Sequence, residues 1–434
     1  MSEKKVKGSP RAGSKKRRAV IAGLLISVAI LLCVGGCGCD AKEDGGPDKI
    51  GVFIEKVRTG SFPNWCAAND LITFTDKLGG RYEVFTMQPD GSDVRCLTAD
   101  APALQGCGNR GQSSWHPSGD YIVFSAENAA YDRSCLGASA RPGWGRNFNV
   151  WIMSADGKEF FRMTDYPENW AVMEAKFSHD GSKVFWCEEH SMEKYPNGKE
   201  GDLLLPGDEP TGPPYGHPGA YHSREQFTYR VGEEMLVWRI VYADISFGGD
   251  GPVMTALHKI DPPPGYTLNE ANGFTPDDDG FIGCYSVLAE TGGRAYAGEL
   301  FACDLEGNLQ QRLTDTVHKH DEDPCYSPGG DRIAYKETKG IVGYEDDLYL
   351  VGADGTGRIQ LTHFADPGYP EYDPIYVRNT ENDYDYVPSG TQITEMCFSP
   401  DGRQIVFGHC IAEEGSYEAV VDVPSYLYLF TLPE

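Results

Sequence analysis

Residues 398–407 of the chain read FSPDGRQIVF, and this stretch decides the fold. Pro400, Asp401 and Gly402 form a turn signal, because proline presets φ, aspartate can bond its own backbone and glycine accepts positive φ. The residues that follow alternate in the pattern of a β-strand, and Phe398 precedes the turn. The stretch therefore predicts a β-hairpin with a large apolar residue on each arm.

The same hairpin recurs along the chain. The six copies begin at Trp65, Trp115, Phe177, Phe274, Tyr326 and Phe398. In four of them the second aromatic residue lies nine positions after the first, and the copy at Trp65 keeps this spacing with an eroded turn. We interpret the copy at Phe274 as having one inserted residue before residues 281–284. Six related hairpins indicate an internal repeat.

A second motif follows most copies, an acidic residue and glycine six positions before Leu-Thr or Met-Thr. These pairs are 90–91 with 97–98, 156–157 with 163–164, 306–307 with 313–314, and 354–355 with 361–362. Strand-like runs flank each pair, so every repeat contains four strands joined by turn, loop and turn. Four antiparallel strands repeated at intervals of about 40 residues or more are typical of β-propeller blades.

The last copy is one strand short. After Phe407 only residues 426–431 form a strand pattern, whereas residues 52–57 form one before the first hairpin. We expect a strand at about 51–57 to complete the last blade and close the ring, which removes open sheet edges. The predicted fold is therefore all-β, a six-bladed β-propeller of four-stranded antiparallel blades spanning residues 49–434.

These repeats resemble the TolB-like β-propeller family over about residues 50–434. The resemblance rests on the Ser-Pro-Asp-Gly hairpins and on the Asp-Gly…Leu-Thr pairs, and it implies a six-bladed propeller. The sequence departs from TolB itself in lacking an additional N-terminal domain, so we do not carry over the role of TolB. No hydrolase domain follows, so the resemblance to propellers of prolyl-oligopeptidase-type enzymes stops at the propeller.

The charge of the chain argues against nucleic-acid binding. The net charge is −27, and residues 1–36 contribute +7 to it, so the remaining residues carry −34. Neutralising nucleic-acid phosphates requires a basic face, which this balance does not offer. The acidity indicates either a solvated surface or an affinity for cations or for a basic partner.

The N-terminus has the features of a bacterial lipoprotein signal peptide, which we assign to residues 1–36. A basic segment precedes an apolar run at 19–34, which is short for a membrane-spanning helix. Residues 34–37, Val-Gly-Gly-Cys, resemble a lipobox, and the resemblance implies cleavage before Cys37 and lipidation of that cysteine. An uncleaved membrane anchor and ordinary secretion are the alternatives.

Residues 37–48 are polar and rich in glycine, so we expect a flexible tether between the lipid and the propeller. In Gram-negative organisms, lipoproteins that stay at the inner membrane commonly carry an aspartate directly after the lipidated cysteine. In this sequence that position is Gly38. The predicted location is then the outer membrane or the cell surface. Because an exported chain can oxidise its thiols, Cys107 and Cys135, predicted on one face, are candidates for a disulfide.

The propeller topology sorts the loops by face. The first and third turns of each blade face one side, and the second loop and the link between blades face the other. All the long segments fall on that second side, at 127–147, 188–234, 286–298, 337–346, 363–391 and 411–424. Either this face binds a partner, as loops on rigid scaffolds often do, or the loops pack together and cap the ring.

Carboxylates recur on the predicted innermost strands, a few residues before the aromatic residue that begins each hairpin. Glu174, Asp323 and Glu395 lie three residues before it, and Glu270 and Glu322 lie four before it. Four blades could therefore direct carboxylates toward the mouth of the central channel. Three interpretations of the cluster remain open: a hydrated acidic rim without a bound ion, a cation site, or a catalytic site. The cation site is one of them because hard cations prefer several oxygen ligands.

Two histidines enter blade 5 at the same mouth. His318 and His320 are two residues apart on an extended segment, so their side chains point the same way and could form half of a metal site. Propeller lyases that act on uronate sugars place a metal with histidine ligands in such a channel. The candidate metal ligands are thus His318, His320, Asp323, Glu174 and Glu395.

Three functions remain open from the sequence. We favour a non-catalytic envelope lipoprotein that presents the long-loop face to a protein or glycan partner. The alternatives are a metal-dependent carbohydrate lyase or hydrolase acting at the channel mouth, and a structural envelope component. Neither a GxSxG motif nor a phosphate-binding loop is present, and Ser178, Ser327 and Ser399 belong to hairpins, so we assign no catalytic residue and no cofactor beyond a bound cation.

Overall fold

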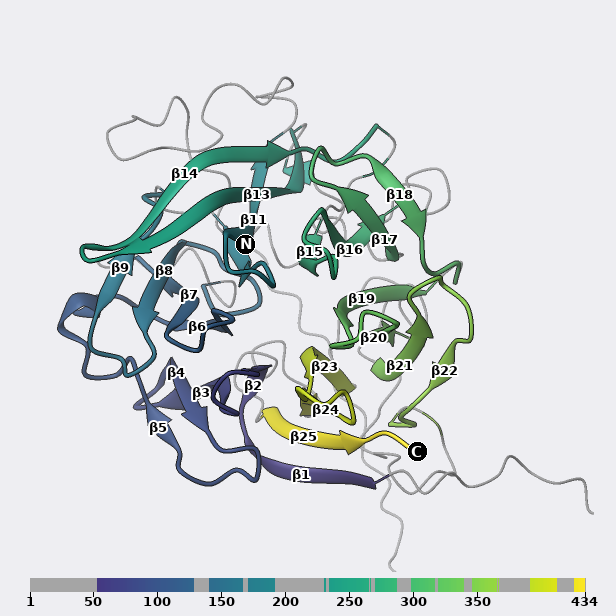
Figure 1. Cartoon of the computed structure of the whole chain (residues 1–434), viewed down its shortest axis with the longest axis horizontal. Coiled ribbons are helices and arrows are strands. Elements are labelled where there is room, and N and C mark those ends of the chain that lie inside the picture. Colours follow the sequence, from purple (N-terminus) through teal and green to yellow (C-terminus); the bar gives the residue numbers. More distant parts are fainter. Residues whose placement is uncertain are drawn as a thin grey trace, which may run out of the picture. The chain divides into compact units, whose positions relative to one another are not determined.

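A computed structural model of the chain describes residues 53–128, 140–166, 171–191, 230–231, 234–264, 266, 270–286, 298–316, 319–338, 346–364, 366, 391–411 and 425–433. These residues form six β-sheets arranged around a common axis (Figure 1), and their one helix is the 3-10 turn η1 (Pro102–Leu104). Within these ranges, no helix combines the length and the hydrophobicity that crossing a membrane requires. The predicted all-β, six-bladed propeller is confirmed.

Each blade is a four-stranded antiparallel sheet whose strands follow one another from the axis outward. Blade 1 contains β2 (Ser61–Trp65), β3 (Ile72–Leu78), β4 (Arg81–Met87) and β5 (Arg95–Cys96). Blade 2 contains β6 (Arg110–Trp115), β7 (Tyr121–Glu127), β8 (Phe148–Ser154) and β9 (Phe160–Arg162). Blade 3 contains β10 (Val172–Phe177), β11 (Lys183–Ser191), β13 (Glu234–Gly248) and β14 (Gly251–Ile260), and β12 (Arg230–Val231) pairs with the start of β13.

The other three blades follow the same order. Blade 4 contains β15 (Glu270–Phe274), β16 (Gly280–Ser286), β17 (Gly298–Asp304) and β18 (Leu309–Arg312). Blade 5 contains β19 (His320–Tyr326), β20 (Arg332–Thr338), β21 (Asp346–Gly352) and β22 (Ile359–Gln360). Blade 6 contains β23 (Thr391–Phe398), β24 (Gln404–Ile411), β25 (Ser425–Thr431) and β1 (Phe53–Thr59).

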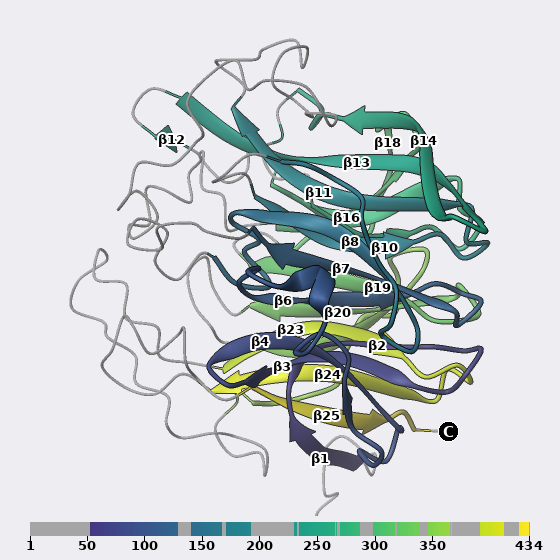
Figure 2. The same cartoon turned by 90° about the vertical axis from the view of Figure 1, so that its left-hand side faces the viewer.

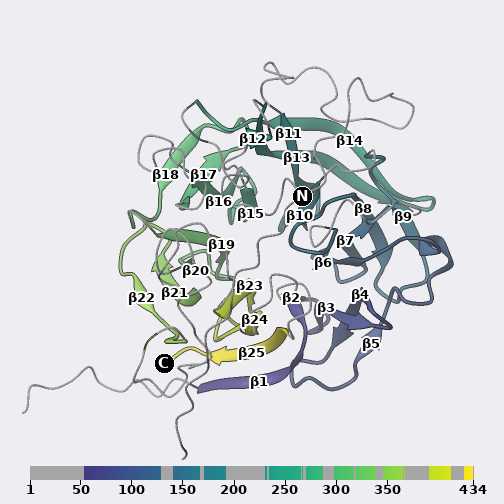
Figure 3. The same cartoon turned by 180° about the vertical axis from the view of Figure 1, so that it is seen from behind.

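The chain closes its own ring, as the sequence predicts. Strand β1 pairs antiparallel with β25, from Phe53 opposite Thr431 to Thr59 opposite Tyr426. Figure 3 shows β1 lying along the outer side of β25. The N-terminal strand therefore supplies the fourth strand of the blade that the C-terminal segment begins.

All six inner hairpins have the same length. In each one, the last residue of the innermost strand pairs with the residue seven positions later. Phe274 pairs with Phe281 in this register, so the predicted inserted residue in blade 4 is wrong. The position nine residues after Phe274 is Gly283, where a Cβ atom would lie 2.1 Å from the backbone oxygen of Glu270. The close approach of the two strands excludes an aromatic residue there.

Serine side chains fasten the hairpin turns. Ser399 Oγ donates to Asp401 Oδ1 at 2.6 Å and accepts a hydrogen bond from Gln404 N at 2.9 Å. Gly402 has φ of +71°, a conformation that glycine adopts without strain. The interpretation of this serine as a hairpin residue rather than a nucleophile agrees with these contacts.

The threonine of each Leu-Thr or Met-Thr motif anchors the fourth strand to the third. In blade 4, Thr314 Oγ1 donates to Glu299 Oε2 at 2.7 Å and accepts from Leu300 N at 2.9 Å. The equivalent threonines, Thr98, Thr164 and Thr362, make the same pair of contacts with Glu83, Asn149 and Asp347 and with the backbone of Val84, Val150 and Leu348. The repeated motif thus satisfies buried polar groups in four blades.

We expect Thr314→Val to lower the free energy of unfolding by about 1–3 kcal/mol, because it leaves the buried Leu300 N–H without its acceptor. Thr314→Ser keeps the hydroxyl and serves as the control. Urea denaturation followed by tryptophan fluorescence measures both variants. Equal stability of the valine and serine variants would show that the motif has no such role.

The hydrophobic core lies between neighbouring blades. One buried cluster joins Val123 of blade 2 with Trp186 and Val241 of blade 3, all of them fully buried. Phe185 of blade 3 meets Phe274 of blade 4 edge to face, with ring centroids 5.4 Å apart. Because each blade buries both faces against its neighbours, the ring forms a rigid support for whatever its rims carry.

The strands run between two rims, which the side view shows (Figure 2). One of them, called the turn rim, carries the first and third turns of each blade, and its longest connection is 88–94. The opposite rim is called the long-connection rim. Every connection of more than seven residues joins strand ends on this rim. Most residues of the six long segments predicted for this rim lie outside the described residues.

Candidate functional site

Every innermost strand contains a β-bulge, where the pairing register shifts. The bulged positions are Phe62, Gln112, Glu174, Asn272, Asp323 and Glu395. A bulge re-aims a side chain out of the regular alternation of a strand. Glu174 and Asp323 have φ of 60° and 55°, which is strained for residues other than glycine and is common where backbone geometry serves a site. The polar members of this set contact one another at the axis, Gln112 with Glu174 and Glu395, and Asn272 with Asp323.

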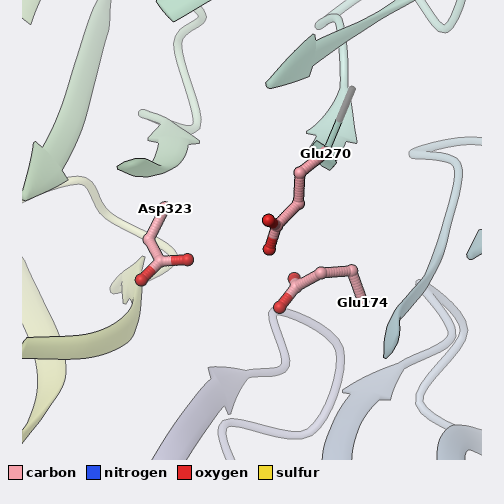
Figure 4. A group of neighbouring side chains, drawn as sticks. All are labelled: Glu174, Glu270 and Asp323. Atoms are coloured by element: carbon pink, nitrogen blue, oxygen red, sulfur yellow. The ribbon is translucent and has the colours of Figure 1, made fainter. Parts of the chain in front are cut away.

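Three carboxylates from adjacent blades converge there. Glu174, Glu270 and Asp323 each offer one oxygen, and these oxygens lie within 4.8 Å of one another. Figure 4 shows the three side chains pointing toward a common point from β10, β15 and β19. All three are buried, with exposed fractions of 3, 7 and 8 %. Glu270 is the first residue of β15, so the group lies toward the long-connection rim.

A buried lysine neutralises part of this group. Lys176 Nζ lies 3.1 Å from Glu174 Oε2 and 3.0 Å from Glu395 Oε2, and it donates to the backbone oxygen of Asn272 at 2.8 Å. Gln112 Nε2 donates to Glu174 Oε1 at 2.8 Å and to Glu395 Oε1 at 3.0 Å. Blades 2, 3 and 6 are therefore joined across the axis through Glu174 and Glu395.

A second buried lysine, Lys336, neutralises part of the charge of the two axial carboxylates of blade 5. Lys336 Nζ lies 2.8 Å from both Glu322 Oε2 and Asp323 Oδ2. Asn272 Nδ2 donates to Asp323 Oδ1 at 3.4 Å, which links blade 4 to blade 5. Two ammonium groups thus hold four of the five axial carboxylates, and the Glu270 carboxylate forms no hydrogen bond or ion pair with any residue that the structure describes.

The three converging carboxylates bind protons more tightly than usual. Burial, followed by the negative charge of Glu395, raises the pKa of Glu174 well above its ordinary value. Burial and the charge of Glu322 do the same to the pKa of Glu270. Burial and Glu322 also raise the pKa of Asp323, to about 6, despite the opposing charge of Lys336.

The two remaining carboxylates behave in the opposite way. Although burial acts against it, the charge of Lys176 lowers the pKa of Glu395. Lys336, with a smaller effect of His320, likewise lowers the pKa of Glu322 in spite of burial. The converging group is therefore the part of the axis that can take up protons, attract a cation or exchange protons with a ligand.

The structure brings together only part of the predicted metal set. Glu174 and Asp323 belong to the converging group, and Glu395 adjoins it through Lys176. His320 is buried outside the group, where its Nδ1 accepts from Gly298 N at 2.9 Å and its Nε2 lies 3.4 Å from Glu322 Oε2. His318 lies outside the described residues.

Sequence reasoning missed the residues that organise the carboxylates. Lys176 lies two residues after Glu174, on the same innermost strand, and Lys336 pairs directly with Glu322 across the β19–β20 hairpin. Acid–base pairs at these spacings were the available signal. Asn272 carried no such signal, because its bulge falls two residues before the aromatic position and not three.

None of the cysteines that the structure describes belongs to the converging group. The nine cysteines that the structure describes are free thiols, Cys107 among them, and burial raises the pKa of Cys107. Its predicted disulfide partner, Cys135, lies outside the described residues. The disulfide stays a prediction that the structure does not support.

The raised pKa of Asp323 predicts a pH dependence of stability. Between its unfolded value near 4 and about 6, the folded protein holds a proton that the unfolded chain has lost. The contribution of this residue to stability is therefore full below pH 4 and declines as pH rises through 6. We expect Asp323→Asn, which cannot titrate, to gain on the order of 2 kcal/mol relative to the wild type between pH 4 and pH 7.

Chemical denaturation in EDTA at several pH values measures this difference directly. Replacing Asp165, an exposed acid beside Arg162, with asparagine provides the control for removing a carboxylate away from the axis. A wild-type advantage over Asp323→Asn that grows with rising pH would contradict the prediction.

Comparison with known proteins found structural similarity only. No protein-family model and no curated protein sequence matches the chain. Similar solved structures include a protein of Agrobacterium tumefaciens assigned as TolB, with 14 % identity over 87 % of this chain and 91 % of that chain and a TM-score of 0.43.

Two enzymes have similarly low values. An oligogalacturonate lyase in complex with manganese is 11 % identical over 89 % of this chain and 95 % of its own, with a TM-score of 0.45. A gluconolactonase of Xanthomonas campestris is 14 % identical over 88 % and 90 %, with a TM-score of 0.42. Such values are too low to support a statement about the activity or the ligands of this chain.

Proposed function

We propose that this chain is a non-catalytic binding module of the bacterial cell envelope that presents its long-connection rim to a protein or glycan partner. The observation that carries the proposal is the asymmetry of the rims, because every connection of more than seven residues joins strand ends on one of them. A closed ring with blade-to-blade cores is a rigid support, and binding surfaces are commonly loops on such supports. The axial carboxylates lie toward the same rim and add a site for a cation.

The proposal includes export and a lipid anchor. The sequence of residues 1–36 and Cys37 supports cleavage and lipidation, and the polar segment 37–48 supports a tether long enough to let the rim meet its partner. We expect Cys37→Ser to abolish labelling with a radioactive fatty acid and to move the protein from the membrane fraction to the soluble fraction. Unchanged labelling would overturn the anchor without affecting the proposed rim.

A second candidate is a metal-dependent carbohydrate lyase or hydrolase at the channel mouth. The buried carboxylates with raised pKa favour it, because such groups can act as general acids or bases. The contacts of His320 with Gly298 and Glu322 argue against it, because they already occupy both ring nitrogens of that predicted metal ligand.

Crosslinking in native envelopes followed by mass spectrometry tests the binding function. Replacing residues 192–229, which connect β11 to β12, by a short Gly/Ser linker should remove specific crosslinks. Lys158→Ala on the turn rim, where this lysine is 78 % exposed, should keep them. Depolymerisation of uronate-containing glycans by the wild type, lost in Glu174→Gln, would instead establish the enzyme.

A further inference from the structure

The axis of the propeller carries more buried negative charge than its own residues neutralise. Five carboxylates meet two ammonium groups there, from Lys176 and Lys336. Each lysine is shared between two carboxylates, and Glu270 has neither as a close partner among the described residues. Buried charge that stays unpaired is costly, so an arrangement of this kind is favourable chiefly when a ligand supplies the missing positive charge.

Unpartnered oxygens of neutral side chains point to the same conclusion. Gln112 Oε1 and Asn272 Oδ1 are buried and have no hydrogen-bond partner among the described residues, and both residues are only 3 % exposed. Their amide nitrogens are already bound to axial carboxylates, Gln112 to Glu174 and Asn272 to Asp323. Two amide oxygens beside the carboxylates therefore lack donors, and amide oxygens are ordinary ligands of hard cations.

The dimensions of the group are compatible with a calcium-sized cation. The converging oxygens of Glu174, Glu270 and Asp323 lie within 4.8 Å of one another. Oxygens that surround calcium at about 2.3–2.6 Å are up to about 5 Å apart, so a group within this spread can hold calcium once its side chains close around the ion. All these candidate ligand atoms are oxygens, which suits calcium better than zinc, since zinc prefers nitrogen and sulfur.

We infer that the propeller axis binds one calcium-sized divalent cation through Glu174, Glu270 and Asp323, with the amide oxygens of Gln112 and Asn272 as further ligands. The lysines hold the second oxygens of Glu174 and Asp323 and so orient these carboxylates. The site differs from the histidine-containing set expected from the sequence. The inference deepens the proposed binding function and rests on the same axial site, but its test does not involve the envelope partner.

Glu270→Gln is the most informative variant, because glutamine keeps the shape of a side chain whose carboxylate has no hydrogen-bond or ion-pair partner among the described residues. In the cation-free protein this change removes repulsion among buried carboxylates, so it should raise the melting temperature. The same change should weaken calcium binding at least 100-fold. A purely structural carboxylate would lower the melting temperature when neutralised, so the two roles give opposite results.

The experiment uses the detergent-solubilised full chain, stripped with EGTA and studied at pH 7.5 by calorimetric titration and thermal unfolding. We expect one calcium ion per chain and a higher melting temperature of the wild type in calcium. Glu270→Gln should show no calcium-induced rise, and Asp165→Asn, which alters an exposed acid, should behave as the wild type.

Three results would overturn the inference. The first is no binding at 1 mM free calcium, and the second is binding that Glu270→Gln leaves unchanged. The third is stoichiometric binding of zinc, but not calcium, that depends on His320. Each result leaves the crosslinking test of the proposed function unaffected, so a failure of one does not hide the outcome of the other.

Discussion

A chain that begins at Gly60, and so lacks β1, is expected to lose most of its stability and to aggregate. Strand β1 forms a ladder of six paired positions with β25. Ile54 and Val57 also pack against the buried clusters of the last and first blades. With about 0.5–1.5 kcal/mol for each backbone hydrogen bond and about 1.5–3 kcal/mol for each buried aliphatic side chain, the loss approaches the total stability of an ordinary domain, about 5–15 kcal/mol.

The deletion also exposes the edge of β25, whose free backbone groups can pair with another chain. A chain that begins at Lys49 retains β1 and is the control. Thermal unfolding by circular dichroism and size-exclusion chromatography compare the two. A synthetic peptide of residues 49–60 should bind the shortened chain and restore part of its melting temperature. Identical melting of the two chains would mean that β1 does not hold the ring closed.

Glu188→Ala should lower the free energy of unfolding by about 3–5 kcal/mol, the largest effect we expect of a single substitution. Glu188 Oε1 lies 2.7 Å from Arg239 Nε, and both side chains are fully buried. Its second oxygen accepts from Tyr166 Oη at 2.5 Å, and that hydroxyl accepts from Trp186 Nε1 at 2.8 Å. When the Glu188 carboxylate is removed, the buried Arg239 guanidinium keeps Asp261 as an acidic neighbour at 3.2 Å. Because Asp261 is partly exposed to water, it compensates the charge of the guanidinium less well.

Two variants test whether buried charge causes this loss. Glu188→Gln keeps the shape and part of the hydrogen bonding, so its cost should be intermediate. Asp165→Ala breaks the exposed pair with Arg162, at 2.6 Å, and should change stability by no more than about 1 kcal/mol. Guanidinium denaturation followed by tryptophan fluorescence measures all three, and equal losses for Glu188→Ala and Asp165→Ala would refute this cause.

The fold could be predicted because its information is local and repeated. Turn residues such as Pro400 and Gly402, and alternating strands beside them, define one hairpin, and six copies define the ring. The error in blade 4 has a physical cause. Aromatic spacing was used to measure hairpin length, but the close approach of two strands makes Gly283 necessary where other blades have an aromatic residue.

The candidate site could be predicted only in part. The carboxylates at the bulge positions were identified, because the repeat places Glu174, Asp323 and Glu395 at one equivalent position. Their separation into paired and converging groups was not predicted. It depends on Lys176 and Lys336, and the meeting of these side chains depends on bulge geometry across separate blades.

The sequence by itself determined the number of blades, the strand order within each blade and the strand that closes the ring. These features follow from periodicity and turn chemistry, which act between residues close together in the chain. Only the tertiary structure decided which oxygens converge, because Glu174, Glu270 and Asp323 come from three different blades and meet only when the ring is complete. It also decided that His320 contacts Gly298 and Glu322 instead of joining that group, since burial and packing assign its two ring nitrogens.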